Sequence, residues 1–73
     1  MPTDENIARE VRAELARQRR TQDDVAAHLR IGQPAVSRRL KAQVPFTAAE
    51  LASLAIWLDV PLAQLLGKQE AAS

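Results

Sequence analysis

The sequence contains no cysteine, and it has only one histidine among its 73 residues. Neither a disulfide framework nor a thiolate metal site can therefore stabilise the fold. A single histidine, His28, without cysteine also argues against a zinc site, so we expect no metal. Packed apolar helix faces must supply the stability, to which dimerisation could add. A chain of this length forms one domain, which we assign to residues 1–73.

Long apolar runs are also absent. No stretch approaches the ~18 apolar residues of a membrane span, and no apolar stretch follows the acidic N-terminus as it would in a secretory signal. We therefore expect no membrane partner and a cytoplasmic location. The sequence also lacks a glycine-rich phosphate loop and a defensible pair of nucleophile and base. We accordingly expect neither an enzyme nor a cofactor nor a small-molecule ligand.

Charge is unevenly distributed, although the net charge is only +1. The segment Leu15–Pro45 contains seven arginine and lysine residues against two aspartates, whereas the rest of the chain contains three cations against seven carboxylates. A basic middle between acidic ends suggests a side that faces phosphate. Ordinary solvated helix charge would give the same pattern, so charge alone leaves both interpretations open.

Apolar periodicity predicts an all-α chain of five short helices. The first stripe, for example, repeats at Ile7, Val11 and Leu15. We expect the last residues, 68–73, to form a frayed tail after Gly67 ends the last helix. The predicted helices are Asp4–Arg19, a short helix after Thr21, Gln33–Lys41, a helix after Thr47, and Pro61–Leu66.

Helix starts are marked by capping residues. Thr21 with Asp24, and Thr47 with Glu50, have the spacing of a capping box. Gly32 can cap the third helix, whose first turn tolerates a proline because the N–H groups there lack helical partners.

Residues 21–41 carry the strongest functional signal. The link between the second and third helices is too short for a hairpin of long helices, so the two should cross at a large angle, as in a helix-turn-helix. Arginine can pair with guanine and glutamine with adenine in the major groove, while serine and lysine reach phosphates or base edges. The predicted inward residues are Val25, Ala26, Leu29, Ile31 and Val36. The predicted outward residues are Gln33, Pro34, Ser37, Arg38 and Lys41, with Arg39 on the same polar side.

This stretch resembles the lambda-repressor-like (Cro/repressor-type, XRE) helix-turn-helix family. The resemblance covers roughly Ile7 to Leu66, and the combination of Ser37–Leu40 with Pro45-Phe46 is similar to actinobacterial and phage regulators. The matching residues are Thr21-Gln22, Val25-Ala26, Leu29, Ile31, Val36-Ser37-Arg38, Leu51, Leu54-Ala55, Leu58-Asp59-Val60 and Leu65-Leu66.

The resemblance implies a compact five-helix DNA-binding fold and a role for individual side chains. Its base-reading positions fall on Gln33, Pro34, Ser37 and Arg38. Its phosphate contacts fall on Gln22 at the start of the second helix and on Lys41 after the third. We add Arg20, Thr21 and Arg39 as further contacts to the DNA backbone.

The chain also departs from the family pattern. Arg30 stands where the family usually has a glycine in the turn, and Gly32 stands where it has a serine or threonine cap. We therefore expect a differently shaped turn, with the glycine moved by two residues. Arg39 replaces an apolar residue, whose packing Leu40 should take over.

The sequence is best interpreted as a sequence-specific double-stranded DNA-binding transcriptional regulator, most simply a homodimeric repressor at the nucleoid. Two alternatives stay open. One is a protein-interaction module, an antitoxin or adaptor, on the same fold, and the other is the DNA-binding domain of a longer regulator. Trp57 can be assigned either to the core or to an exposed dimer contact.

Overall fold

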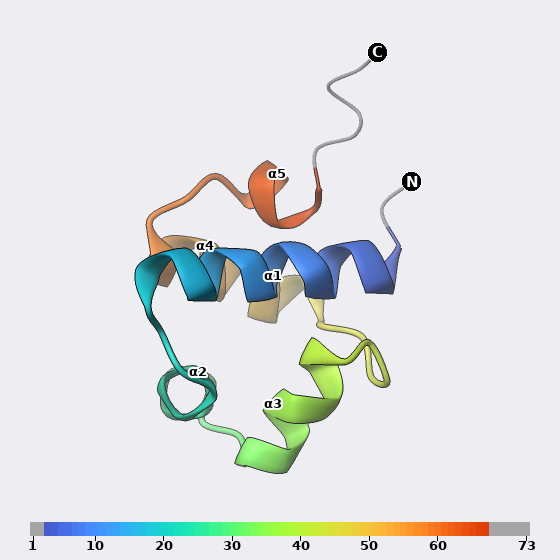
Figure 1. Cartoon of the computed structure of the whole chain (residues 1–73), viewed down its shortest axis with the longest axis vertical. Helices are drawn as coiled ribbons and strands as arrows, with labels where there is room; N and C mark the ends of the chain where they lie inside the picture. The colour runs from blue at the N-terminus through green and yellow to red at the C-terminus, as the bar shows by residue number, and fades with distance from the viewer. Residues whose placement is uncertain (1–2, 68–73) are drawn as a thin grey trace.

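The computed structural model describes residues 3–67, which form five helices and no strand, and the all-α prediction is confirmed (Figure 1). The predicted tail at 68–73 lies outside the described residues. None of the helices in 3–67 has the length and apolar character needed to cross a membrane. The helices are α1 (Asp4–Gln18), α2 (Gln22–Leu29), α3 (Gln33–Leu40), α4 (Ala48–Leu58) and α5 (Leu62–Leu65).

Both predicted capping boxes are present. The Thr21 hydroxyl accepts a hydrogen bond from the Asp24 N–H at 3.1 Å, and the Asp24 carboxylate accepts one from the Thr21 N–H at 2.8 Å. Thr47 and Glu50 form the same reciprocal pair, with both distances 3.0 Å. These bonds satisfy amide groups that have no partner inside a helix, and they start α2 and α4 at defined residues.

The helix ends correct one expectation about the turn before α3. Arg30 ends α2 in the left-handed conformation, with φ 59° and ψ 42°, whereas Gly32 has an ordinary φ of −71°. The turn therefore keeps its left-handed residue at the position where the resemblance expects glycine, and the predicted shift of the glycine is wrong. An arginine adopts this unfavourable conformation because packing on both sides of the turn determines the path of the chain.

Helix α1 runs through the middle of the molecule. It lies between α5 on one side and the pair α2 and α3 on the other, with α4 behind it in Figure 1. Its apolar stripe belongs to one cluster with buried side chains from all the other helices, so one small core unites the fold. The core residues are Val11, Leu15, Val25, Val36, Leu40, Leu51, Leu54, Ala55, Leu58 and Leu65.

Polar contacts from α1 reinforce this arrangement at both ends. The Arg12 guanidinium donates a hydrogen bond to the Leu40 carbonyl at the end of α3. The Gln18 amide donates one to the Leu58 carbonyl at the end of α4, at 2.7 Å. Carbonyls at the ends of helices lack internal partners, so these two side chains satisfy acceptors that α3 and α4 leave open.

Candidate nucleic-acid interface

Helices α2 and α3 form the predicted helix-turn-helix. Figure 1 views α2 along its axis, whereas α3 lies across the view, so the two cross at a large angle. Val25 and Val36 are fully buried where the helices approach. Ala26, Leu29 and Ile31 are partly buried and pack against the same core. The turn is therefore held by apolar contacts on each side, which keeps α3 in one orientation.

Helix α3 is amphipathic because its apolar residues recur four positions apart. Val36 and Leu40 face the core, and Pro34 lies in the first turn, where no helical hydrogen bond is lost. An isolated helix of this length would be unstable in water, so contacts with α1 and α2 are what maintain it. The opposite face carries the exposed residues Gln33, Pro34 and Arg38.

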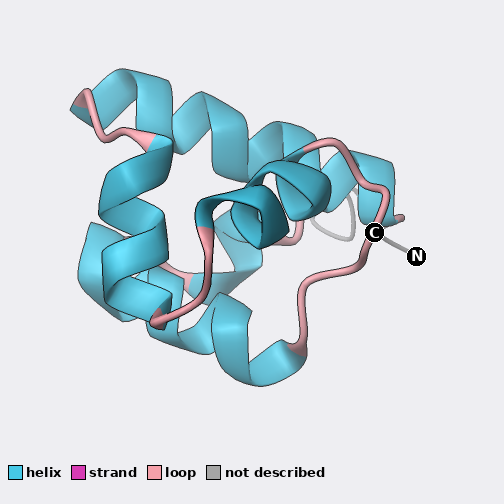
Figure 2. Ribbon diagram, turned by 90° about the horizontal axis from the view of Figure 1, so that it is seen from below, coloured by secondary structure: helices cyan, strands magenta, loops and turns pink. Residues whose placement is uncertain are grey.

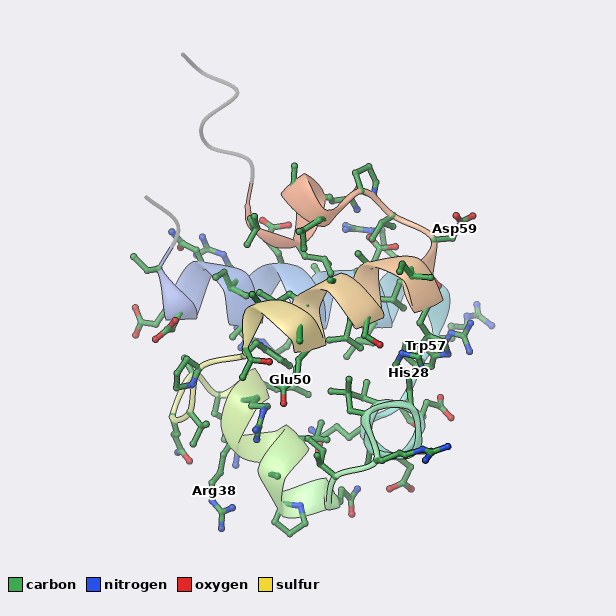
Figure 3. All side chains as sticks on the ribbon, turned by 180° about the vertical axis from the view of Figure 1, so that it is seen from behind. His28, Arg38, Glu50, Trp57 and Asp59 are labelled. Atoms are coloured by element: carbon green, nitrogen blue, oxygen red, sulfur yellow. The ribbon has the colours of Figure 1, made fainter. Side chains whose placement is uncertain are left out.

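The structure brings the four predicted base-reading residues together on α3. Gln33, Pro34 and Arg38 are exposed, and Ser37 is partly buried. Figure 3 shows the Arg38 side chain extending away from the body of the molecule. Within residues 3–67, neither a side-chain hydrogen bond nor an ion pair is recorded for Arg38, so its guanidinium donors are available to an external acceptor. Figure 2 looks onto α2 and α3 from this side of the molecule.

The predicted contacts to the DNA backbone lie at two separate places around α3. Arg20, Thr21 and Gln22 are exposed at the start of α2. Lys41 is exposed at the other place, directly after the last residue of α3. Cationic and polar groups thus lie at the start of α2 and at the end of α3, the two ends of the helix-turn-helix, where they are available to phosphates.

Arg39 does not share this exposure, and its predicted outward placement is wrong. Its Nε donates to the Glu50 carboxylate at 3.0 Å, and its Nη1 donates to the Ala35 carbonyl at 3.1 Å. Only 17% of its side chain is exposed. The arginine replaces an apolar residue by joining α3 to the first turn of α4 through an ion pair.

The two carboxylates that form the capping boxes, Glu50 and Asp24, both have lowered pKa values. Burial raises the pKa of the Glu50 carboxyl, but hydrogen bonds from the Thr47 amide and from Arg39 outweigh burial, so the pKa lies below its ordinary value. The pKa of Asp24 is also lowered, mainly by the hydrogen bond from the Thr21 amide. Both carboxylates are therefore ionised at neutral pH and are occupied by helix capping.

A shallow hollow of about 260 Å³ beside the end of α3 contains cations that sequence reasoning missed. Arg9 and Arg12 of α1 line it together with Lys41, Ala42 and Glu5. Both arginines lie outside the basic middle segment of the chain, so the charge distribution along the sequence does not link them to Lys41. The two arginines are three residues apart, and this spacing indicates that they share one face of a helix. Only the fold shows that this face of α1 adjoins α3.

Trp57 belongs in part to the core, which is one of the two assignments that the sequence leaves open, and the dimer contact stays a prediction. It is partly exposed and packs against the apolar core. Its ring also stacks on His28, with ring centroids 4.9 Å apart and planes 11° apart, and the Arg20 guanidinium carbon lies 4.6 Å from the ring centroid. His28 is partly buried, and its Nε2 lies 2.8 Å from the Ser53 hydroxyl.

Within residues 3–67, no group of three or more histidine, cysteine, aspartate or glutamate side chains is placed so that it could bind one metal ion. In a comparison with protein families, the model of the BetR domain matches residues 3–73. Neither the curated proteins nor the solved structures contain a match to the chain.

Proposed function

Since the chain belongs to the BetR domain family, whose members are small helical domains of the helix-turn-helix type, we propose that it is a sequence-specific double-stranded DNA-binding regulator of transcription. The observation that carries the proposal is the outward face of α3. Gln33, Pro34 and Arg38 are all exposed there, on a helix whose other face is held in the core. Membership of the lambda-repressor-like family stays a prediction from the resemblance.

In the proposed complex α3 enters the major groove and α2 lies across the DNA backbone. The Arg38 guanidinium can donate two hydrogen bonds to the O6 and N7 atoms of guanine, and the Gln33 amide can pair with adenine. Ser37 can bond a base edge. Pro34 offers only an apolar surface, which suits the methyl group of thymine.

Phosphate contacts would hold α3 in register from two directions. Arg20, Thr21 and Gln22 would contact the backbone beside the start of α2, and Lys41 with Arg9 would contact it beyond the end of α3. We leave Arg39 out of this set, although the sequence predicts it there, because Glu50 and the Ala35 carbonyl already hold its guanidinium.

One recognition helix reads only a few base pairs, so we propose that two copies bind adjacent half-sites about 34–36 Å apart. The exposed apolar side chains Ile56 and Leu62, which are 82% and 41% exposed, are available for contact between the copies. We further propose that the protein acts as a repressor, because occupancy of a promoter is sufficient to block transcription. Sedimentation with and without duplex would give the stoichiometry, and a promoter reporter would give the sign of regulation.

Selection from a pool of random duplexes tests the proposed function. We expect one sequence class to be enriched, with affinity that falls steeply as the salt concentration rises. The Arg38→Ala variant is the matched control, because its fold should be intact while its enrichment is weaker at one base position. Absence of both enrichment and salt dependence would contradict the proposal and favour a protein-interaction module.

A further inference from the structure

Trp57 lies at a point where three parts of the fold meet. It belongs to α4, it contacts Arg20 at the junction of α1 and α2, and it stacks on His28 of α2. Figure 3 shows Trp57 and His28 close together beside α2, on the side of the molecule away from Arg38. None of the predicted base-reading residues takes part in this cluster, so the proposed readout by α3 does not account for it.

The indole ring is a fixed surface. One part of it packs against the core, and His28 stacks on it. His28 is itself held by α4, because its Nε2 lies within hydrogen-bonding distance of both the hydroxyl and the carbonyl oxygen of Ser53. A side chain that rests on this ring is therefore ordered relative to both α2 and α4.

The main chain of Arg20 is equally well defined. Its N–H donates to the Leu15 carbonyl at 2.8 Å, which closes the end of α1, and the next residue, Thr21, caps α2. Only the side chain of Arg20 retains rotational freedom, and the contact with Trp57 restricts that freedom. Folding thus orders a long, flexible side chain before any DNA is bound.

The Arg20 guanidinium, whose carbon lies 4.6 Å from the ring centroid, keeps hydrogen-bond donors for other partners. The attraction of a guanidinium to an aromatic face uses its charge, and the group carries five N–H donors around its edge. Arg20 is exposed, and no side-chain hydrogen bond or ion pair of Arg20 is recorded among residues 3–67. The hydrogen bond from the Thr21 amide is the main cause of the lowered pKa of Asp24, and the charge of Arg20, which directly precedes Thr21 at the start of α2, acts in the same direction.

We propose that Trp57 is a positioning residue for DNA binding: it holds the Arg20 guanidinium so that its free N–H edge meets a DNA phosphate beside α2. This inference rests on the proposed function and deepens it. Immobilising a free arginine on binding weakens affinity by about 2- to 10-fold. The contact with Trp57 avoids this loss, although Trp57 itself does not touch DNA.

A double-mutant cycle on the selected duplex tests the inference. Trp57→Leu should weaken binding by about 2- to 10-fold while the salt dependence persists, because Arg20 can still reach the phosphate. Arg20→Ala should lower the slope of log affinity against log salt by about 0.9. In the Arg20→Ala background Trp57→Leu should cost nothing further. The matched control is Arg19→Ala, at the neighbouring exposed arginine that ends α1, and any effect of this variant on affinity should add to that of Trp57→Leu.

Two measurements separate positioning from a general structural role. Trp57→Phe retains an aromatic face and should recover most of the lost affinity even if Trp57→Leu folds poorly. In the free protein, the Arg20 Nε–Hε resonance should carry a ring-current shift that is lost in Trp57→Leu. Additive losses for Arg20 and Trp57 would overturn this inference and leave the proposed function standing. Failure of the wild-type protein to select any duplex would overturn both.

Discussion

The Gln64 amide of α5 donates a hydrogen bond of 2.6 Å to the carboxylate of Glu14, fifty residues earlier in α1. The same carboxylate accepts hydrogen bonds from Arg17 and Gln18, and Glu14 is only 5% exposed. The hydrogen bond from Arg17, followed by that from Gln18, lowers the pKa of Glu14 despite the opposing effect of burial. One buried, ionised carboxylate thus joins the first and last helices, and its contribution to stability must depend on pH.

We expect Glu14 to stabilise the protein at neutral pH and to lose this effect in acid. The pKa of Glu14 is lower in the folded protein than in the unfolded chain. Its contribution to stability is therefore fully present above the unfolded-state pKa, and it disappears as the pH falls through the folded-state pKa. Chemical denaturation should show Glu14→Gln to be less stable by about 1–3 kcal/mol at pH 7. The difference in the free energy of unfolding between the wild type and Glu14→Gln should narrow below about pH 4.

The wild-type protein should also lose stability in acid through other groups, since the pKa values of Asp24 and Glu50 are lowered as well. The informative quantity is therefore the difference between wild type and Glu14→Gln at each pH. A difference that stays constant from pH 7 to pH 3 would show that ionisation of Glu14 does not matter.

Arg38→Ala should reduce affinity for the preferred duplex by about 1–3 kcal/mol and relax the preference at one base pair. Arg38 extends from α3 without an intramolecular partner recorded in residues 3–67, so its removal should not disturb the fold. Lys41→Ala is the contrasting variant, because loss of a phosphate contact weakens binding to all sequences alike and lowers the salt slope by about 1. Titration of both variants against the preferred duplex and single-base variants distinguishes the two effects. An unchanged sequence preference in Arg38→Ala would remove Arg38 from the readout.

Arg39→Met should affect stability more than DNA binding. The substitution keeps the length of the side chain but leaves Glu50, which is 18% exposed, without its ion-pair partner. We expect a loss of about 1–2 kcal/mol in the free energy of unfolding. The salt slope of DNA binding should not change, because Arg39 is held by Glu50 and Ala35. A slope reduced by about 0.9 would instead support the phosphate contact predicted from sequence.

Arg30→Gly should stabilise the protein. Arg30 has a φ of 59°, a conformation that costs an L-residue about 1–2 kcal/mol and costs glycine almost nothing. The greater freedom of glycine in the unfolded chain offsets part of this gain, so we expect a net gain of about 0.5–1 kcal/mol. Thermal unfolding should show a midpoint higher by about 2–8 °C. The control is Arg30→Ala, which removes the charge but keeps the strain, and an equal gain in that variant would argue against the backbone explanation.

Gly32→Ser should also raise the melting temperature. Gly32 caps α3 without a side-chain hydrogen bond, and its φ of −71° and ψ of 154° suit a serine. An added Cβ would lie 3.6 Å from the Pro34 Cδ, which is an ordinary contact. The new hydroxyl can share the Ala35 N–H, which already donates to the Gly32 carbonyl at 3.0 Å, for a gain of about 0.3–1 kcal/mol. Gly32→Ala supplies the comparison, since it restricts the unfolded chain without forming a cap, and the two variants should therefore differ in midpoint.

Short-range patterns in the sequence were sufficient to predict the helices. Capping boxes join residues three positions apart, and the i, i+4 spacing of Val36 and Leu40 lies within one short helix. These signals depend only on local geometry, so they could be interpreted without knowing how the helices pack. The outward residues Gln33, Pro34 and Arg38 followed from the same periodicity, and the structure exposes all three.

The tertiary structure decided which long side chains are available for binding. Arg38 and Arg39 are neighbours of identical type, yet one is exposed and the other is paired with Glu50 from the next helix. The contact between Arg20 and Trp57 likewise joins residues that are remote in sequence. An arginine reaches partners on any element packed nearby, and its role therefore depends on the relative positions of helices, which no local pattern specifies. The sequence by itself determined which residues form α3 and which of its faces turns outward. Only the packing of the helices determined which cationic side chains are exposed beside it.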